Sequence, residues 1–207
     1  PLMIKYHELG TPMNILPLNA IGALPTRNLQ AGAFEGAVEI SGERLAERYL
    51  GRRVACAHCP VACIHLATLR EAYPNDPYFF KTSLIGYDHE LVYAVGSMLG
   101  GADVPGMLQL LDEIEVLGLD VMSTGVVLAW ATEALQKGLI SAHETDGLEL
   151  AWGGYPAYIA ATQRIVSQPN DFYRALARGV EHAAATYGGS SYALAFGGNE
   201  MPGYHTG

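Results

Sequence analysis

Three cysteines, Cys56, Cys59 and Cys63, lie within eight residues of a 207-residue chain that contains no other cysteine. An odd number of thiols so close together is a poor basis for a disulfide framework. The spacing Cys-x2-Cys-x3-Cys instead places three thiolates on one tight loop, as an iron–sulfur cluster requires of its nearest ligands. The fold is therefore expected to present this loop to a metal centre.

A complete four-iron cluster needs a fourth ligand, which this chain does not supply as a cysteine. The fourth ligand would come from sequence outside the chain, from a partner, from a side chain other than cysteine or from solvent. One alternative is a structural zinc ion bound by the three thiolates and by His58 or His65. Another is a group of three buried, unligated cysteines in a helical core.

Charged residues make up 16% of the chain, against about a quarter in average soluble domains. With 24 glycines and so few charges, either the core is large or part of the surface faces something other than water. The net charge of −9 repels phosphate backbones and anionic lipid, which argues against nucleic acid and membranes as partners. Because no apolar run reaches 18 residues and the N-terminus does not resemble a signal peptide, we expect a cytoplasmic protein.

The pattern of apolar residues, caps and helix breakers predicts a mainly α fold, a multi-helical bundle-like domain. Frequent Gly and Pro predict an irregular, extended N-terminal 40 residues with turns rather than long helices. Residues 147–154 are expected to form a short extended link. The absence of alternating strands and helices, and of internal repeats, argues against a doubly wound sheet and a solenoid. Helices are predicted over residues 42–50, 88–99, 103–118, 122–137, 155–167 and 171–186.

Several short motifs in a fixed order resemble the tungsten-pterin aldehyde ferredoxin oxidoreductase family nearly from end to end. Each motif is weak alone, and their order makes the resemblance strong. The blocks are Gly10–Pro12, Leu24–Asn28, Ile40–Glu43, Ala55–Cys63, Tyr93–Ser97, Gly118–Asp120, Ser123–Gly125, Trp152–Gly153 and Asn199–Pro202.

The resemblance implies a helical region that follows an N-terminal β saddle holding two pterins and one tungsten, or molybdenum, atom. It also implies a C-terminal part with a second pterin motif and the fourth cluster cysteine. Neither part is found in this sequence. Residues 1–207 are therefore expected to be one cluster-bearing helical region, the middle of a larger enzyme or a piece of a split one.

Carried over from the family, Cys56, Cys59 and Cys63 match three ligands of a [4Fe-4S] cluster. The segment 115–120 resembles the first Asp-x-x-Gly-Leu-Asp pterin motif, although a glutamate stands at its first position. From the residues alone, the same segment reads equally well as the end of one helix and the start of the next. The pterin-binding candidates are Glu115, Gly118, Leu119 and Asp120.

Asp88 and Glu90 occupy the place of the family's glutamate-rich stretch and are the acid–base candidates. A carboxylate near the metal could activate the water that attacks an aldehyde carbonyl. The plainer alternative for each residue is a helix cap or a solvated helix start. At the C-terminal end, His205 replaces the aspartate usual in aldehyde oxidisers and hints at a divergent subgroup, such as the aromatic thioester reductases.

The resemblance thus implies part of an oxidoreductase that converts an aldehyde or related oxo compound to a carboxylic acid, with no turnover on its own. Expected partners are a ferredoxin-like electron acceptor, the missing saddle and C-terminal regions in cis or in trans, and a second copy in a homodimer. The alternatives are an electron-transfer or binding subunit of a split or divergent member and a zinc-stapled helical domain without redox role.

Overall fold

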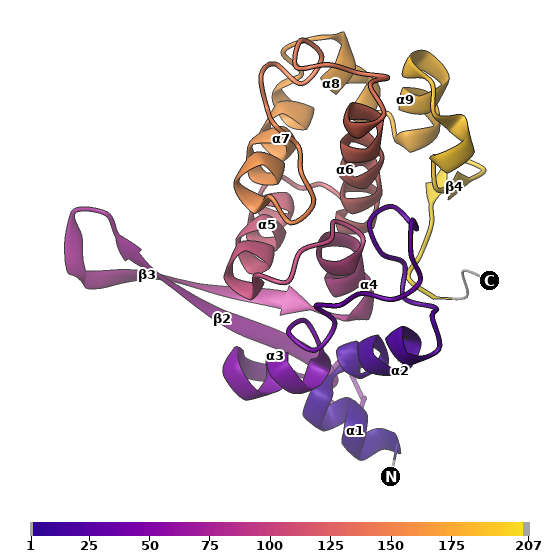
Figure 1. Cartoon of the computed structure of the whole chain (residues 1–207). Coiled ribbons are helices and arrows are strands. Elements are labelled where there is room, and N and C mark those ends of the chain that lie inside the picture. Colours follow the sequence, from indigo (N-terminus) through magenta and orange to yellow (C-terminus); the bar gives the residue numbers. More distant parts are fainter. Residues whose placement is uncertain (1, 205–207) are drawn as a thin grey trace.

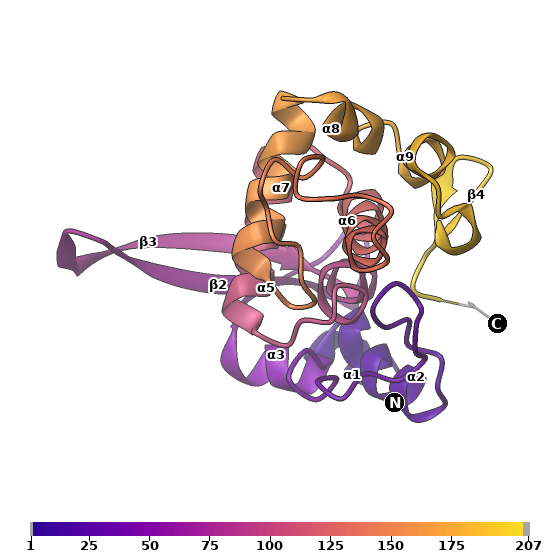
Figure 2. The ribbon, with the colours of Figure 1, turned by 45° about the horizontal axis from the view of Figure 1, so that its top comes forward.

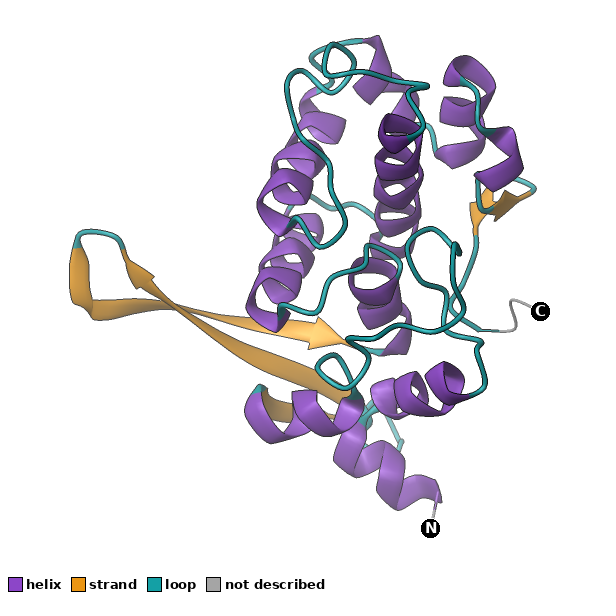
Figure 3. Ribbon diagram, in the orientation of Figure 1, coloured by secondary structure: helices purple, strands orange, loops and turns teal. Residues whose placement is uncertain are grey.

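Helices form the body of the molecule, and a long β hairpin extends from it (Figure 1). The structure, a computed structural model, describes residues 2–204. Helices α5 (Val104–Val116), α6 (Val121–Gln136) and α7 (Tyr155–Ser167) lie side by side in the body (Figure 3). Helix α6 is central, because it buries side chains around most of its circumference, including Trp130. The predicted mainly α fold is confirmed in this part of the chain.

The predicted helix boundaries follow from local caps. Asp103 begins α5, its carboxylate accepting a bond from the Gly106 N–H at 3.1 Å. Gly118 follows the end of α5 with a φ of +72°, the left-handed conformation that glycine adopts readily. Ser41 likewise begins α3 (Gly42–Arg48). Sequence-local chemistry therefore determines these helices.

The N-terminal 40 residues are not wholly extended, which corrects the prediction. They contain α1 (Leu2–Leu9), a 3-10 turn (Thr11–Asn14) and α2 (Ile15–Ala20). Pro12 and Pro17 lie in the first turns of the second and third of these elements, where the missing N–H has no helical partner to lose. The prolines therefore start helices here, and turns dominate only from residue 21 to residue 41.

A three-stranded antiparallel sheet was not predicted. It has the order β1 (Leu50–Val54), β2 (Ile64–Tyr73) and β3 (Asp76–Tyr87). Strands β2 and β3 pair from His65↔Tyr87 to Tyr73↔Asp76, so Pro74 and Asn75 form the turn of the hairpin. In both views the far end of the hairpin extends beyond the helices (Figure 2). Its tip exposes aromatic side chains, among them Tyr78 and Phe79.

Two predicted helices are interrupted. The helix expected over 88–99 consists of α4 (His89–Val92) followed by a π-helical turn over Tyr93–Ser97. The helix expected over 171–186 is split into α8 (Asp171–Leu176) and α9 (Val180–Tyr187), because Gly179 has a φ of +93°. Residues 147–154 form no strand.

The chain after α9 contains a 3-10 turn (Ser190–Tyr192) and a two-stranded ribbon, β4 (Ala195–Phe196) and β5 (Asn199–Glu200). Within residues 2–204, no single helix has the length and apolar character needed to span a membrane. Helices α5 and α6 meet that criterion only as a pair, bent by 118°. His205 lies outside the described residues.

Candidate functional site

The three cysteines lie on the loop of residues 55–63 that joins β1 to β2, here called the cysteine loop. The pair Val54↔Ile64 closes this loop at its base. Within it, the Cys59 N–H donates to the Cys56 carbonyl oxygen at 3.0 Å and forms a tight turn. All three thiols are free, with Cys56 exposed and Cys59 and Cys63 half-buried. The three cysteines thus lie on one loop, as their spacing predicts.

The backbone of the cysteine loop is strained at two positions. His58 and Ala62 have φ values of 63° and 53°, in the left-handed region that side chains disfavour. Each such residue costs about 1–2 kcal/mol. External contacts offset this cost: the His7 ring on α1 donates from Nδ1 to the Val61 carbonyl oxygen at 2.8 Å. Helix α1 therefore supports the loop directly.

A row of three side chains supports the base of the same loop. Arg53, His65 and Tyr87 lie opposite one another on β1, β2 and β3. Arg53 donates from Nε to the His7 carbonyl oxygen at 2.8 Å, and His65 Nε2 lies 2.9 Å from the same oxygen. His65 Nδ1 lies 3.2 Å from the Tyr87 hydroxyl. The loop, α1 and the sheet are thus connected by hydrogen bonds through His7.

The donor set of this loop suits an iron–sulfur cluster in kind and in its spacing along the sequence, because three cysteines, whose thiolates are soft ligands, come from one short segment. Within the described residues, no three His, Cys, Asp or Glu side chains are gathered closely enough to hold a metal ion. His65 is fully buried and both of its ring nitrogens have partners, so it would have to give up both contacts to complete a zinc site. His58, by contrast, is exposed on the loop itself.

The segment resembling the pterin motif joins α5 to α6. The Gly118 N–H donates to the Glu115 carbonyl oxygen and the Leu119 N–H to that of Ile114, which ends α5. Asp120 begins α6, its carboxylate accepting from the Ser123 N–H at 2.7 Å. The interpretation of this segment as two helix caps is therefore correct geometrically. A ligand role would come in addition to it.

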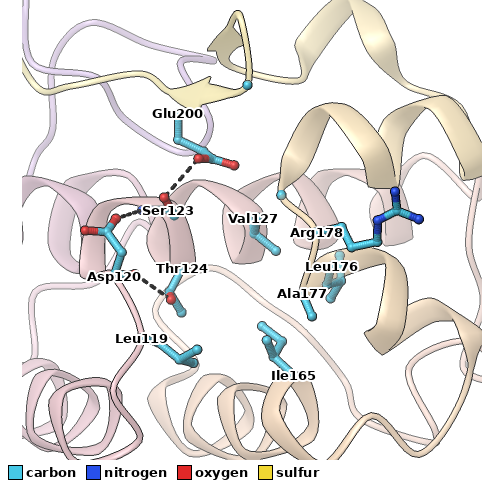
Figure 4. A pocket seen from close by; sticks show the side chains of 12 residues that line it. Leu119, Asp120, Ser123, Thr124, Val127, Ile165, Leu176, Ala177, Arg178 and Glu200 are labelled. Carbon is cyan, nitrogen blue, oxygen red and sulfur yellow. Dashed lines mark hydrogen bonds between the residues drawn. The ribbon is translucent and has the colours of Figure 1, made fainter.

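A cavity of about 310 Å³ opens beside this corner (Figure 4). Leu119 and Asp120 line it, whereas Glu115 and Gly118 do not. Apolar residues from three helices form its floor, and Arg178 and Glu200 stand at its rim. The structure thus brings two of the four predicted pterin residues to a concave surface.

Glu200 is a site residue without a predicted role. Its carboxylate accepts from the Ser123 hydroxyl at 2.9 Å and from the Val180 N–H at 3.0 Å. Glu200 and Asp120 therefore both bond to Ser123 at the first turn of α6 (Figure 4). The only feature of the sequence that pointed to Glu200 was its position in the family-like block Asn199–Pro202. Glu200 connects the starts of α6 and α9 across the cavity.

The two acid–base candidates have different environments. Asp88 is exposed and begins α4, accepting from the Leu91 N–H at 3.0 Å. Glu90 is half-buried and accepts from the Gly203 N–H at 2.7 Å. Burial raises the pKa of Glu90, an effect that the Gly203 N–H opposes and the nearby charge of Asp88 reinforces. The two carboxylates are therefore close along the chain but differ in exposure.

The C-terminal strap, residues 200–204, lies across the start of α4. The Tyr93 hydroxyl donates to the Met201 carbonyl oxygen at 3.0 Å. The buried His89 ring lies 3.3 Å through Nε2 from the Gly203 carbonyl oxygen and 4.2 Å, centroid to centroid, from the Tyr204 ring. Burial lowers the pKa of His89. Sequence reasoning missed His89 because its partners lie more than a hundred positions away.

The strap connects the candidate sites. At one end Glu200 contacts the cavity beside Asp120, and at the other Gly203 contacts Glu90. The β3 residue Tyr87, which contacts His65 below the cysteine loop, directly precedes Asp88. Hydrogen bonds of the strap thus connect the cavity with Glu90, and the sequence itself connects Asp88 with the strand below the cysteine loop.

Comparisons with known proteins give a consistent result. The model of the family described as "Aldehyde ferredoxin oxidoreductase, domains 2 & 3" matches residues 1–206. Tungsten-containing aldehyde ferredoxin oxidoreductases from Thermococcus kodakarensis and Pyrococcus furiosus are each 31% identical over 198 residues, 95% of this chain. The "Aliphatic sulfonate oxidoreductase, WOR-like subunit" of Pyrococcus furiosus is 32% identical over 127 residues, 61% of this chain and 19% of that protein.

Among solved structures, the "Active site complex BamBC of Benzoyl Coenzyme A reductase in complex with 1,5 Dienoyl-CoA" has the same fold, with a TM-score of 0.66. The match covers 94% of this chain and 29% of the other, at 18% identity. The chain spans 31% of the length of the two aldehyde oxidoreductases. The match to residues 1–206, together with the cysteine loop and the ordered motifs, shows that this chain belongs to the aldehyde ferredoxin oxidoreductase family.

Proposed function

We propose that this chain is the cluster-bearing helical portion of a tungsten-pterin, iron–sulfur oxidoreductase. The whole enzyme would convert an aldehyde, or a related oxo compound, and water into a carboxylic acid, two protons and two electrons. A ferredoxin-like protein would accept the electrons one at a time. The observation that carries the proposal is the set of three free thiols on one supported loop in a member of this family.

Cys56, Cys59 and Cys63 would hold the [4Fe-4S] cluster, with the fourth ligand supplied from outside these 207 residues. When bound, such a cluster accepts and passes on single electrons. The thiolates suit this role because they are soft, anionic donors. The exposure of Cys56 leaves the loop accessible from solvent, as contact with an electron acceptor requires.

Leu119 and Asp120 would contact the pterin, because they line the cavity at the α5–α6 corner. A carboxylate accepts hydrogen bonds from amino and ring N–H groups such as those of a pterin. A Cβ atom at Gly118 would meet no atom within 4 Å, so the backbone there is open to a ligand. Glu115 is exposed and does not line the cavity, so it would lie at the edge of the ligand.

For proton transfer we assign Glu90 rather than Asp88. A general base works best when its pKa approaches the working pH, and burial moves the pKa of Glu90 in that direction. Glu90 would accept a proton from the attacking water. Asp88 already caps α4 and would support the helix that carries Glu90.

A second candidate is an electron-transfer or binding subunit of a split or divergent family member, of the aromatic thioester reductase type. The likeness in fold to the benzoyl-coenzyme A reductase complex favours it. The cluster on the same cysteine loop would then transfer electrons between subunits. Genes next to this one that encode the missing saddle and C-terminal regions would distinguish a split enzyme from a segment of one chain.

The test is anaerobic reconstitution of the chain with iron and sulfide, followed by iron counting and electron paramagnetic resonance of the reduced sample. We expect bound iron and a cluster signal, both lost in C59S and retained in the matched control S190T, which changes an exposed polar residue away from the loop. Zinc by elemental analysis without bound iron would favour the zinc-stapled alternative. A chain without iron and without signal would contradict the proposal.

A further inference from the structure

The cysteine loop has little support of its own. It contains two non-glycine residues with left-handed backbone, His58 and Ala62, and its residues 55–58 are exposed. A loop with this backbone persists when surrounding structure holds it in place. The contacts that do so come from α1 and from the row of side chains behind Cys63.

His65 is the centre of that row. It follows Cys63 by two residues, is fully buried and pairs with Arg53 on one side and Tyr87 on the other. The His7 carbonyl oxygen can only accept, so His65 Nε2 carries the proton of the 2.9 Å contact. His65 Nδ1 then accepts from the Tyr87 hydroxyl at 3.2 Å. Both ring nitrogens of a neutral histidine are satisfied in this way.

These contacts connect His65 to the cysteine loop by a second route. His65 and Arg53 hold the His7 carbonyl oxygen, and the His7 side chain donates to Val61 inside the cysteine loop. Gly10 lies against the same ring, where a Cβ atom would come within 3.1 Å of His65 Nδ1. A change at His65 would therefore reach the loop both through the strand to Cys63 and through α1 to Val61.

We propose that His65 is a positioning residue for the cysteine loop: through His7 and Tyr87 it holds the backbone on which the three thiols stand. It is not a ligand itself. The proposal rests on the proposed function in one respect, that the thiols hold a cluster, and the positioning of the loop can be measured without one.

The experiment uses the full chain in two states. In the metal-free state, hydrogen–deuterium exchange of residues 55–63 reports the order of the loop. We expect H65L to speed this exchange by about ten-fold, the effect of losing one to two buried hydrogen bonds. Y87F, which removes one partner, and H65Q, which keeps an N–H donor for the His7 carbonyl oxygen, should fall between H65L and the unaltered chain.

The control is T132V on α6. Thr132 is also fully buried, and its hydroxyl donates to the Leu128 carbonyl oxygen and contacts the Tyr158 hydroxyl, away from the loop. T132V should lower the thermal midpoint without changing exchange in the loop. Exchange in Y87F and H65Q no faster than in T132V would overturn the proposal.

In the reconstituted state, the rate at which a chelator bleaches the cluster is compared among the same variants. Supporting groups around metal ligands typically change metal affinity by about 10–100-fold, and we expect Y87F to bleach at least several-fold faster than T132V. Failure of the unaltered chain to bind iron would contradict the proposed function, while the exchange result would still decide the role of His65.

Discussion

Replacing Gly203 with alanine would drive a methyl group into the buried ring of Tyr93. A Cβ atom on Gly203 would lie 2.7 Å from Tyr93 Cδ1 and Cγ and 3.1 Å from its Cβ, which is closer than carbon atoms pack. Gly203 is not among the glycines with positive φ, so alanine brings no conformational cost of its own. The steric conflict alone therefore determines the effect.

The conflict can be relieved in two ways. If the Tyr93 ring shifts within the core, overpacking costs about 1–3 kcal/mol. If the strap moves away instead, the 2.7 Å bond from the Gly203 N–H to Glu90 is lost, and a bond to a charged group contributes about 1.5–3 kcal/mol. The chain will follow the less costly route, so we expect G203A to lose about 1–3 kcal/mol.

Denaturant unfolding of the full chain measures this loss. The matched control is G86A, because a Cβ atom there meets only Leu66 Cδ2, at an ordinary 3.8 Å, and Gly86 also lacks a positive φ. We expect G86A to stay within about 0.5 kcal/mol of the unaltered chain. Equal stabilities of G203A and G86A would refute the packing of the strap on Tyr93. If the strap moves, the pKa of Glu90 rises further, because the N–H that lowers it is gone.

Three further predictions concern single side chains. Burial raises the pKa of Glu90 in the folded state. The stability that protonated Glu90 contributes is therefore complete below the pKa of the unfolded state and is lost as the pH rises through the pKa of the folded state. E90Q should therefore gain stability relative to the unaltered chain from about pH 4 to about pH 7, as measured by unfolding at both values; no change in the difference would exclude the shift. In G125A a Cβ atom would lie 2.4 Å from the Ala94 carbonyl oxygen, so α6 and the π-helical turn must separate, at a cost of about 1–3 kcal/mol in the free energy of unfolding. D120A removes the cap of α6 and should lower the free energy of unfolding by about 1 kcal/mol, as D103A should at α5. If D103A lowers the thermal midpoint and D120A does not, the cap of α6 is not needed.

Helix ends were predictable because their determinants lie within a few residues. The helices predicted over residues 42–50 and 103–118 begin at the caps Ser41 and Asp103, and the second of them ends beside Gly118. The cysteine spacing likewise predicted three thiols on one loop, because so few residues separate them along the chain. The same local rules failed at Pro12 and Pro17, where residues that interrupt helices instead begin them.

The hairpin was missed because its inward-facing residues are not strongly apolar. Positions 65, 67 and 69 alternate toward the body as His65, Ala67 and Leu69, and only the last is a large aliphatic residue. Elements distant in the sequence cover this face: α5 packs against β2 and β3, and Gly10 lies against the His65 ring. A period-two pattern made of histidine and alanine gives no clear hydrophobic signal.

The sequence by itself determined the mainly helical body, the loop of three thiols and the motifs of the family. Each of these depends on residues that lie close together along the chain. The tertiary structure decided which of these residues face a shared site. Glu90 meets Gly203 across 113 positions and His65 meets His7 across 58, and a carboxylate or imidazole acquires its role from such partners. Two determinants exist only once the chain has folded: the burial that raises the pKa of Glu90, and the His7 carbonyl oxygen that fixes the tautomer of His65.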